Sequence, residues 1–197
     1  MIRKLSIYIS DIFLKNSSIK NSQYENSVFG LEVIFILIFQ TVGLIILGIL
    51  LQKLDKLIFF FLPFMILRTS AGGMHASSAV KCFFCSVASF LIALFLEYLV
   101  SSFKYFIYIN LFISFLLIYS YAPQDSINKP FKEGEKEIFR HKSLLTFTAL
   151  LIIIIFSHNI KYFYNLTVLS SIGILFESIT LLPIFNNHKL IDANSNN

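Results

Sequence analysis

Charged residues are scarce in this sequence. They make up 14% of its 197 residues, whereas about 25% is usual in soluble globular domains. Hydrophobic residues make up 56%, and the mean hydropathy is +0.76. A soluble core cannot bury so much apolar surface, but a bilayer needs about 20 apolar residues for each spanning helix. The composition therefore predicts an integral membrane protein and excludes an ordinary soluble domain.

Cysteine is also scarce. Cys82 and Cys85 are the two cysteines, and they lie three residues apart. They cannot form a disulfide framework that links distant parts of the chain, so any thiol function must be local. The first 27 residues contain no long apolar core followed by a small-residue cleavage site, and we therefore expect no cleaved signal peptide.

Basic residues exceed acidic ones, and the formal net charge is +5. They fall in short stretches between apolar runs and form no basic surface interleaved with aromatic residues, so we expect no nucleic-acid partner. With six spans and a cytoplasmic N-terminus, all but four of the 16 lysines and arginines lie on the cytoplasmic side, as the positive-inside rule requires. The four exceptions are Lys53, Lys56, Lys104 and Lys161.

Six apolar runs organise the chain, at 31–51, 57–67, 83–100, 106–121, 144–156 and 162–185. They predict an all-α polytopic membrane protein, a single domain over 1–197 with a bundle of four to six transmembrane helices. The second run is short, contains Pro63 and leads directly into a polar stretch. It spans the membrane only if it is joined to that stretch, and otherwise it re-enters.

Two polar segments flank these runs. Residues 1–27 form a cytoplasmic or interfacial N-terminal segment, in which the spacing of Ile2, Leu5, Ile9 and Ile12 suits an amphipathic helix. Such a helix lies either in the membrane interface or against the bundle. Residues 123–143 are rich in both charge signs and are predicted to form a polar cytoplasmic loop.

The stretch that contains His75 and Cys82 is the anomaly of the sequence, because polar groups near a bilayer are costly and usually functional. A cysteine nucleophile needs a base, and histidine suits that task near neutral pH. On one continuous helix the two residues would stand about 10.5 Å apart along the axis, whereas proton transfer needs about 3 Å. The chain must therefore bend between them.

Ser77 and Ser78 are good N-cap residues for a helix that begins just before Cys82. The positive end of that helix would favour the Cys82 thiolate, and the Gly72-Gly73 pair could bring His75 back over the sulfur. Three other interpretations stay open. Cys82 and His75 can be structural residues, Cys82 and Cys85 match a C-x-x-C redox pair, and His75 with both cysteines could supply three metal ligands.

Two blocks of sequence resemble the AgrB family, the accessory gene regulator B proteins that process AgrD-type precursor peptides. The first block is Arg68 with Ala71-Gly72-Gly73-Met74-His75 and a cysteine seven residues later, at Cys82. The second runs from Ala122-Pro123 to Asn128-Lys129-Pro130. The length and the order of the apolar runs match as well, so the resemblance covers nearly the whole chain.

The resemblance implies that His75 and Cys82 are the catalytic pair of a membrane cysteine endopeptidase, which cuts an AgrD-like precursor on the cytoplasmic side and promotes its cyclisation in quorum-sensing signal biosynthesis. It also implies a homodimer. We expect no cofactor and no metal. Cys85 has no role in the family pattern, and we interpret it as a packing residue. The rival functions are a membrane thiol oxidoreductase that uses Cys82 and Cys85, and a non-catalytic transporter.

Further residues are candidates for binding the substrate or the oxyanion, or for orienting His75. Arg68 either reaches the membrane interface or binds a carboxylate of the precursor. Backbone N–H groups near Gly73 are candidate oxyanion donors. The remaining candidates are Ser77, Ser78, Gln124, Asp125 and Lys129. Lys129 and the basic residues after it could also attract anionic lipids. We expect Glu32, Glu97 and Glu177 to be helix-end or inter-helix partners.

Overall fold

The computed structural model describes residues 2–15, 24–73, 79–100, 103, 105–124 and 134–186. The described residues form helices and no strand, which confirms the all-α prediction. The helices are α1 (Ile2–Lys15), α2 (Tyr24–Leu50), α3 (Leu54–Ala71), α4 (Ala79–Val100), α5 (Phe106–Tyr121), α6 (Glu135–His158), η2 (Lys161–Phe163), α7 (Tyr164–Thr180) and α8 (Pro183–Asn186).

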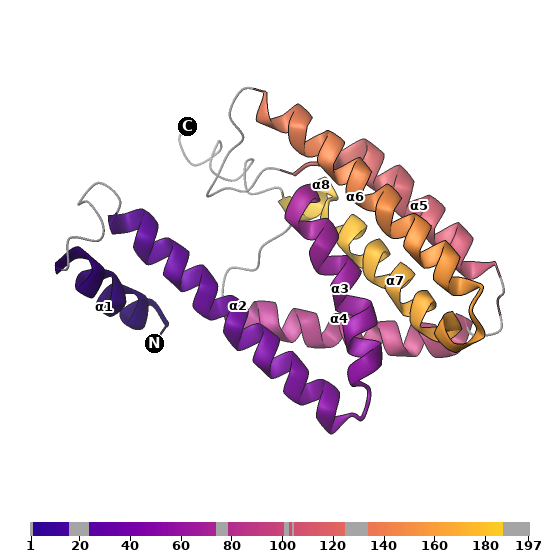
Figure 1. Ribbon diagram of the computed structural model, residues 1–197, viewed down its shortest axis with the longest axis horizontal. Coiled ribbons are helices and arrows are strands. Elements are labelled where there is room, and N and C mark those ends of the chain that lie inside the picture. The colour runs from indigo at the N-terminus through magenta and orange to yellow at the C-terminus, as the bar shows by residue number, and fades with distance from the viewer. Residues whose placement is uncertain are drawn as a thin grey trace.

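Helix α3 packs most extensively against α7, and the two run in the same direction at the centre of the bundle (Figure 1). Pro63 lies inside α3 and has no N–H to donate to the carbonyl four residues earlier, that of Phe59. The hydroxyl of Ser170 in α7 donates to this carbonyl at 2.9 Å. Gly173 lets the helices approach closely, since a Cβ there would collide with the Phe60 carbonyl oxygen.

Helices α3, α5 and α7 run in one direction and α2 and α6 in the opposite direction, whereas α4 crosses the others obliquely (Figure 1). Helices α3, α5 and α7 all end at one end of the bundle, where α6 begins. The opposite end holds the turn between α2 and α3, the end of α4 and the 3-10 turn η2.

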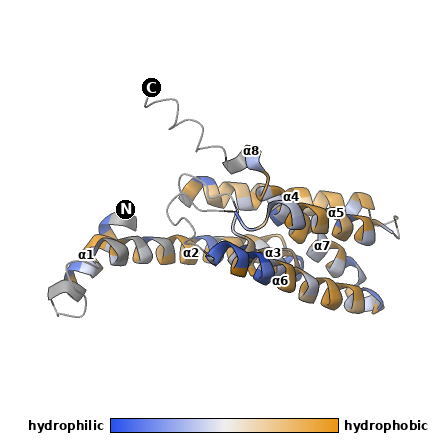
Figure 2. Cartoon of the chain, turned by 90° about the horizontal axis from the view of Figure 1, so that it is seen from above, coloured by the Kyte–Doolittle hydropathy of each residue, from blue (hydrophilic) through white to orange (hydrophobic). Residues whose placement is uncertain are grey.

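Three of the described helices are long and apolar enough to cross a membrane, over Gly30–Leu50, Val80–Val100 and Glu135–His158. Helix α5 is apolar but shorter, with 16 residues. Figure 2 shows hydrophobic residues along α2 and α4, and hydrophilic residues gathered at the start of α6. The chain is therefore a membrane protein, and its count of four to six spans stays a prediction.

Three boundaries differ from the sequence-based expectation. The second apolar run is a continuous helix through Pro63 to Ala71, because Ser170 compensates for the proline. The last run is divided into η2, α7 and α8. The stretch 123–143, predicted to be a loop, is helical from Glu135 onward, and acidic residues in the first turn of α6 suit a helix start.

Helix α1 packs against α2, away from the rest of the bundle (Figure 1). Ser6 and Ser10 are buried, whereas Leu5, Tyr8 and Ile12 are exposed. The Tyr24 hydroxyl donates to Asp11 at 2.6 Å, and this hydrogen bond raises the pKa of Tyr24. The helix has the predicted position in the sequence, and its exposed apolar residues and its contact with α2 leave both predicted locations, the membrane interface and the bundle surface, as predictions.

Candidate functional site

The end of α3 is tied to α7 by a buried ion pair. Nη1 of Arg68 lies 3.1 Å from Oε2 of Glu177, whose side chain is fully buried, and the Arg68 side chain is 20% exposed. The guanidinium also lies over the Phe64 ring, 5.7 Å from its centroid. The parallel packing of α3 and α7 brings these residues together from positions 109 apart in the sequence.

A glycine turn follows α3. Gly72 and Gly73 have φ angles of +76° and +125°, which side-chain-bearing residues rarely adopt. A Cβ on Gly73 would lie 2.5 Å from the Thr180 hydroxyl oxygen and 3.1 Å from Oε1 of Glu177. A Cβ on Gly72 would lie 2.5 Å from the carbonyl oxygen of Gln124. Glycine is therefore needed at both positions for conformation and for space.

Gln124, one of the predicted candidates, joins this turn to the ends of α5 and α7. Its backbone N–H donates to the Ala71 carbonyl at 2.9 Å, and its side-chain amide donates to the Leu181 carbonyl at 2.8 Å. The chain segments around residues 72, 123 and 180 are thus held together by hydrogen bonds and close contacts. We call Arg68, Gly72, Gly73, Gln124, Glu177 and Thr180 the α3-end cluster.

Cys82 lies in the first turn of α4, which begins at Ala79 as the sequence predicts for a helix that starts just before this cysteine. Both cysteines are free thiols; Cys82 is half-buried and Cys85 is exposed. The next residue, Phe83, packs on α2: a Cβ on Gly43 would lie 2.6 Å from its ring, and the ring centroids of Phe39 and Phe83 are 5.8 Å apart. The first turn of α4 is therefore anchored on the middle of α2.

The described residues do not place Cys82 in the α3-end cluster. Helix α3 ends at the upper end of the bundle in Figure 1, whereas α4 begins lower, beside α2. Seven residues link the two helices, and five of these, 74–78, lie outside the described residues, among them His75, Ser77 and Ser78, as do Asp125 and Lys129. Of the predicted site residues, the structure therefore describes Arg68, Gly73, Cys82 and Gln124, and it brings together all of these except Cys82.

In this structure Glu177 of the same chain pairs with the Arg68 guanidinium, and the two predicted roles of Arg68 stay predictions. Sequence reasoning gave Glu177 no chemical role beyond an inter-helix contact. The signal that could have identified the pair is a lone arginine and a lone glutamate near the C-terminal ends of two apolar segments, where a buried charge needs a partner.

No group of three His, Cys, Asp or Glu residues that could hold a metal occurs among the described residues. The alternative metal site involves His75, which lies outside them. The two cysteines of the alternative redox pair, Cys82 and Cys85, are three residues apart on one helix, α4.

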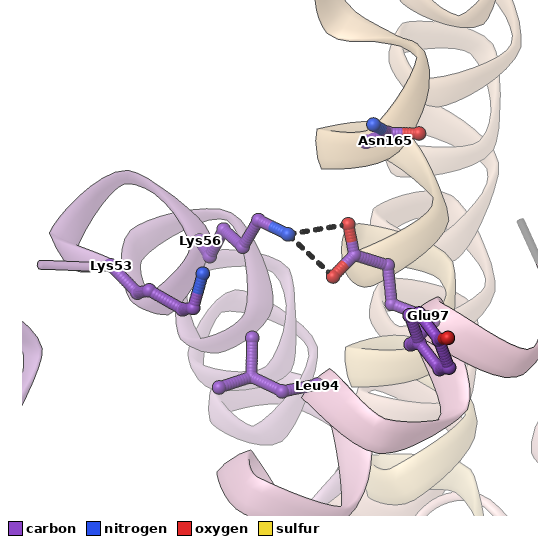
Figure 3. A pocket seen from close by; sticks show the side chains of 6 residues that line it. Lys53, Lys56, Leu94, Glu97 and Asn165 are labelled. Atoms are coloured by element: carbon purple, nitrogen blue, oxygen red, sulfur yellow. Dashed lines mark hydrogen bonds and ion pairs between the residues drawn. The ribbon is translucent and has the colours of Figure 1, made fainter. Parts of the chain in front are cut away.

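A second polar region lies at the opposite end of α3. The ammonium group of Lys56 is 2.6 and 2.7 Å from the two carboxylate oxygens of Glu97 in α4. This pair borders an open pocket of about 380 Å³, which Lys53, Leu94, Tyr98 and Asn165 also line (Figure 3). Glu97 and Glu177 are both inter-helix partners, as the sequence predicts.

Known proteins resemble this chain over most of its length. The family described as Accessory gene regulator B matches residues 6–181. The Accessory gene regulator protein B of Staphylococcus aureus strain JH9 is 33% identical over 63% of this chain, and the match spans 64% of that protein's own length. That of Staphylococcus intermedius is 28% identical, over 80% of this chain and 81% of its own.

A Putative AgrB-like protein of Clostridium perfringens strain SM101 is 30% identical over 100% of this chain and 99% of its own length. No solved structure matches the chain significantly. The family match covers both blocks of sequence that carry the resemblance and the helices from α2 to α7. The chain therefore belongs to the accessory gene regulator B (AgrB) family, whose members act in accessory gene regulator quorum-sensing signalling.

Proposed function

We propose that this protein is a membrane cysteine endopeptidase that removes the C-terminal tail of an AgrD-like precursor peptide, with Cys82 as nucleophile and His75 as its base. The observation that carries the proposal is the position of Cys82 in the first turn of α4. The backbone N–H groups of the first turn have no acceptor within their own helix, and together with the positive end of the helix dipole they can stabilise the negative charge that develops during the reaction.

The reaction would proceed through an acyl-enzyme. The Cys82 thiolate attacks the carbonyl carbon of the scissile peptide bond, His75 protonates the departing amine, and the precursor's tail leaves. The N-terminal part then remains bound to Cys82 as a thioester. A cysteine or serine side chain of the precursor attacks this thioester, which forms a thiolactone or lactone and releases Cys82. Exclusion of water favours this cyclisation over hydrolysis.

The glycine turn and the start of α4 are the sources of oxyanion donors in this proposal. Backbone N–H groups that point at a developing negative charge stabilise it without reorganisation. Gly73 is held in a fixed conformation by its surroundings, and the N-terminal N–H groups of α4 have no acceptor within their own helix. The donors therefore come from the two ends of the segment that contains His75.

The proposal also includes the side of the membrane, the position of the precursor, the oligomeric state and the bound lipids. Cleavage takes place on the cytoplasmic side, because the end of the bundle where α3, α5 and α7 terminate is the end that the charge distribution assigns to the cytoplasm. The precursor lies along this interface as an amphipathic helix. The enzyme works as a homodimer, and anionic lipids gather at the basic residues between α5 and α6.

Co-expression of a candidate precursor with wild type, Cys82→Ala and His75→Ala tests the proposal, with precursor size followed on a gel and product mass by spectrometry. We expect both variants to accumulate intact precursor. Cys85→Ala is the matched control, because Cys85 lies on the same helix one turn further on and is exposed. We expect this variant to cleave at the wild-type rate.

The rival functions give other patterns. If Cys82→Ala and Cys85→Ala fail alike, a thiol oxidoreductase is favoured, because such an enzyme needs both thiols. If all three variants still cleave the precursor, the assignment of His75 and Cys82 is wrong and a non-catalytic role is favoured.

A further inference from the structure

Glu177 is the most deeply buried charged residue of the α3-end cluster, and the proposed reaction does not use it. Its carboxylate is fully buried, and only one oxygen, Oε2, pairs with Arg68. The other oxygen, Oε1, has no hydrogen-bond partner. The Thr180 hydroxyl, which donates to the backbone carbonyl of Glu177 at 2.8 Å, lies beside Gly73. A buried carboxylate with an unsatisfied oxygen is costly and calls for an explanation.

The unsatisfied oxygen faces Gly73. It lies 3.1 Å from the point that a Gly73 Cβ would occupy, and the Thr180 hydroxyl lies 2.5 Å from the same point. The carboxylate therefore closes the space beside the last described residue before the His75 segment. On the other side of the turn, the Gln124 carbonyl closes the space beside Gly72 in the same way.

We infer that Glu177 and Gln124 are positioning residues of the peptidase site: they fix the Gly72–Gly73 turn, from which the chain continues to His75. This inference rests on the proposed function. Arg68 holds the carboxylate in place, and Gln124 fixes the turn by bonds to Ala71 and Leu181. Neither residue has to touch the substrate. Each acts through the backbone that carries the catalytic histidine.

The position of the turn matters because the proposed pair must meet within hydrogen-bond distance. Cys82 is anchored on α2 through Phe83, whereas the His75 segment departs from the α3-end cluster. The two anchors therefore set the distance between base and nucleophile. A displacement of about 1 Å in such an arrangement can lower the rate about a hundredfold.

The Lys56–Glu97 pair offers a matched control. It also joins α3 to another helix through a largely buried glutamate, but it lies at the opposite end of α3 (Figure 3). Glu97→Gln should weaken the contact of α3 with α4 and leave the glycine turn in place. A general loss of helix packing would therefore affect Glu97→Gln and Glu177→Gln alike, whereas a positioning role affects only Glu177→Gln.

The experiment measures cleavage by the purified full-length protein in vesicles, with a synthetic candidate precursor, and resolves kcat and KM per folded protein. Wild type, Glu177→Gln, Gln124→Ala, Glu97→Gln and Cys82→Ala are compared. We expect kcat of Glu177→Gln and Gln124→Ala to fall roughly tenfold to a hundredfold with KM nearly unchanged. Glu97→Gln should keep the wild-type kcat.

Gln124→Ala also keeps the inference testable if Glu177→Gln does not fold, because it removes one hydrogen bond at a half-buried position and no charge. Wild-type kcat in Gln124→Ala and in folded Glu177→Gln, or an equal loss in Glu97→Gln, overturns the inference. If Cys82→Ala cleaves like wild type, the proposed function itself is wrong. Failure of the inference and failure of the proposed function are therefore distinguishable.

Discussion

The two ends of α3 each carry an ion pair, and the two pairs differ in burial and in what surrounds them. At the start of the helix, Lys56 meets both carboxylate oxygens of Glu97, with side chains 25% and 9% exposed. At the end, Arg68 meets one oxygen of a fully buried Glu177. The first pair borders an open pocket, and the second borders the Gly72–Gly73 turn.

The two pairs illustrate two roles of a buried charge in a membrane protein, one in helix packing and one at a functional site. The Lys56–Glu97 pair satisfies both of its carboxylate oxygens and is accounted for by packing alone. The Arg68–Glu177 pair leaves the oxygen Oε1 without a hydrogen-bond partner, beside a backbone conformation that favours glycine. A buried polar group that is not fully satisfied is typical of a functional site.

The largest effect should come from breaking the more deeply buried pair. Arg68→Met leaves the Glu177 carboxylate without a counter-charge, and we expect the free energy of unfolding to fall by about 3–5 kcal/mol. Titration with SDS in mixed micelles measures this loss. The double variant Arg68→Met with Glu177→Met should recover most of it. A loss below about 1 kcal/mol in the single variant would contradict the burial of this pair.

The next largest loss of stability should come from a substitution in the glycine turn. Gly73→Ala places a methyl group against Thr180 and Glu177, whereas Gly134→Ala meets no atom within 4 Å. Both variants strain a backbone of positive φ, +125° at Gly73 and +84° at Gly134, and Gly73→Ala adds the steric contact. We expect Gly73→Ala to be less stable than Gly134→Ala by about 1–3 kcal/mol in the same titration. Equal losses would show that the turn is not confined.

Breaking the ion pair at the start of α3 should destabilise the protein less. Lys56→Met removes the partner of Glu97, but this pair is more exposed to solvent, and water at the pocket can hydrate the carboxylate. We expect a loss of about 1–2 kcal/mol, smaller than that of Arg68→Met under the same conditions. If the two losses are equal, the difference in burial between the ends has no energetic consequence.

The smallest expected effect is a difference between the two ion pairs in how salt changes the destabilisation. Screening acts on charges that solvent reaches and much less on buried ones. Raising the salt concentration to about 1 M should therefore reduce the destabilisation by Lys56→Met by a few tenths of a kcal/mol and leave that by Arg68→Met unchanged. The same decrease in both variants would place both pairs in contact with solvent.

Much of the fold could be predicted from the sequence, because apolar runs of bilayer length report spanning helices directly. The α5 helix has the predicted bounds, and α4 ends at the predicted Val100. The start of α6 and the continuity of α3 could not be predicted. The first depends on polar residues that continue a helix beyond its apolar run, and the second on a hydroxyl of α7 that compensates for Pro63.

The candidate site was predictable only in part. The N-cap candidates Ser77 and Ser78 predicted a helix that begins just before Cys82, and Cys82 lies in the first turn of α4. Gln124 was one of several candidates, and its bonds to Ala71 and Leu181 depend on how α5 and α7 end together. The pairing of Glu177 with Arg68 is a long-range contact between parallel helices, which hydrophobic periodicity does not report.

The most direct test of the proposed peptidase is the mass of the enzyme during turnover. Purified protein with Cys85→Ala is mixed with a synthetic AgrD-like precursor, quenched in acid and digested for peptide mass spectrometry. We predict that the N-terminal part of the precursor is bound to Cys82 as a thioester that hydroxylamine releases, and that Cys82→Ala forms neither adduct nor product. Product formation by Cys82→Ala at the wild-type rate would contradict the proposed mechanism.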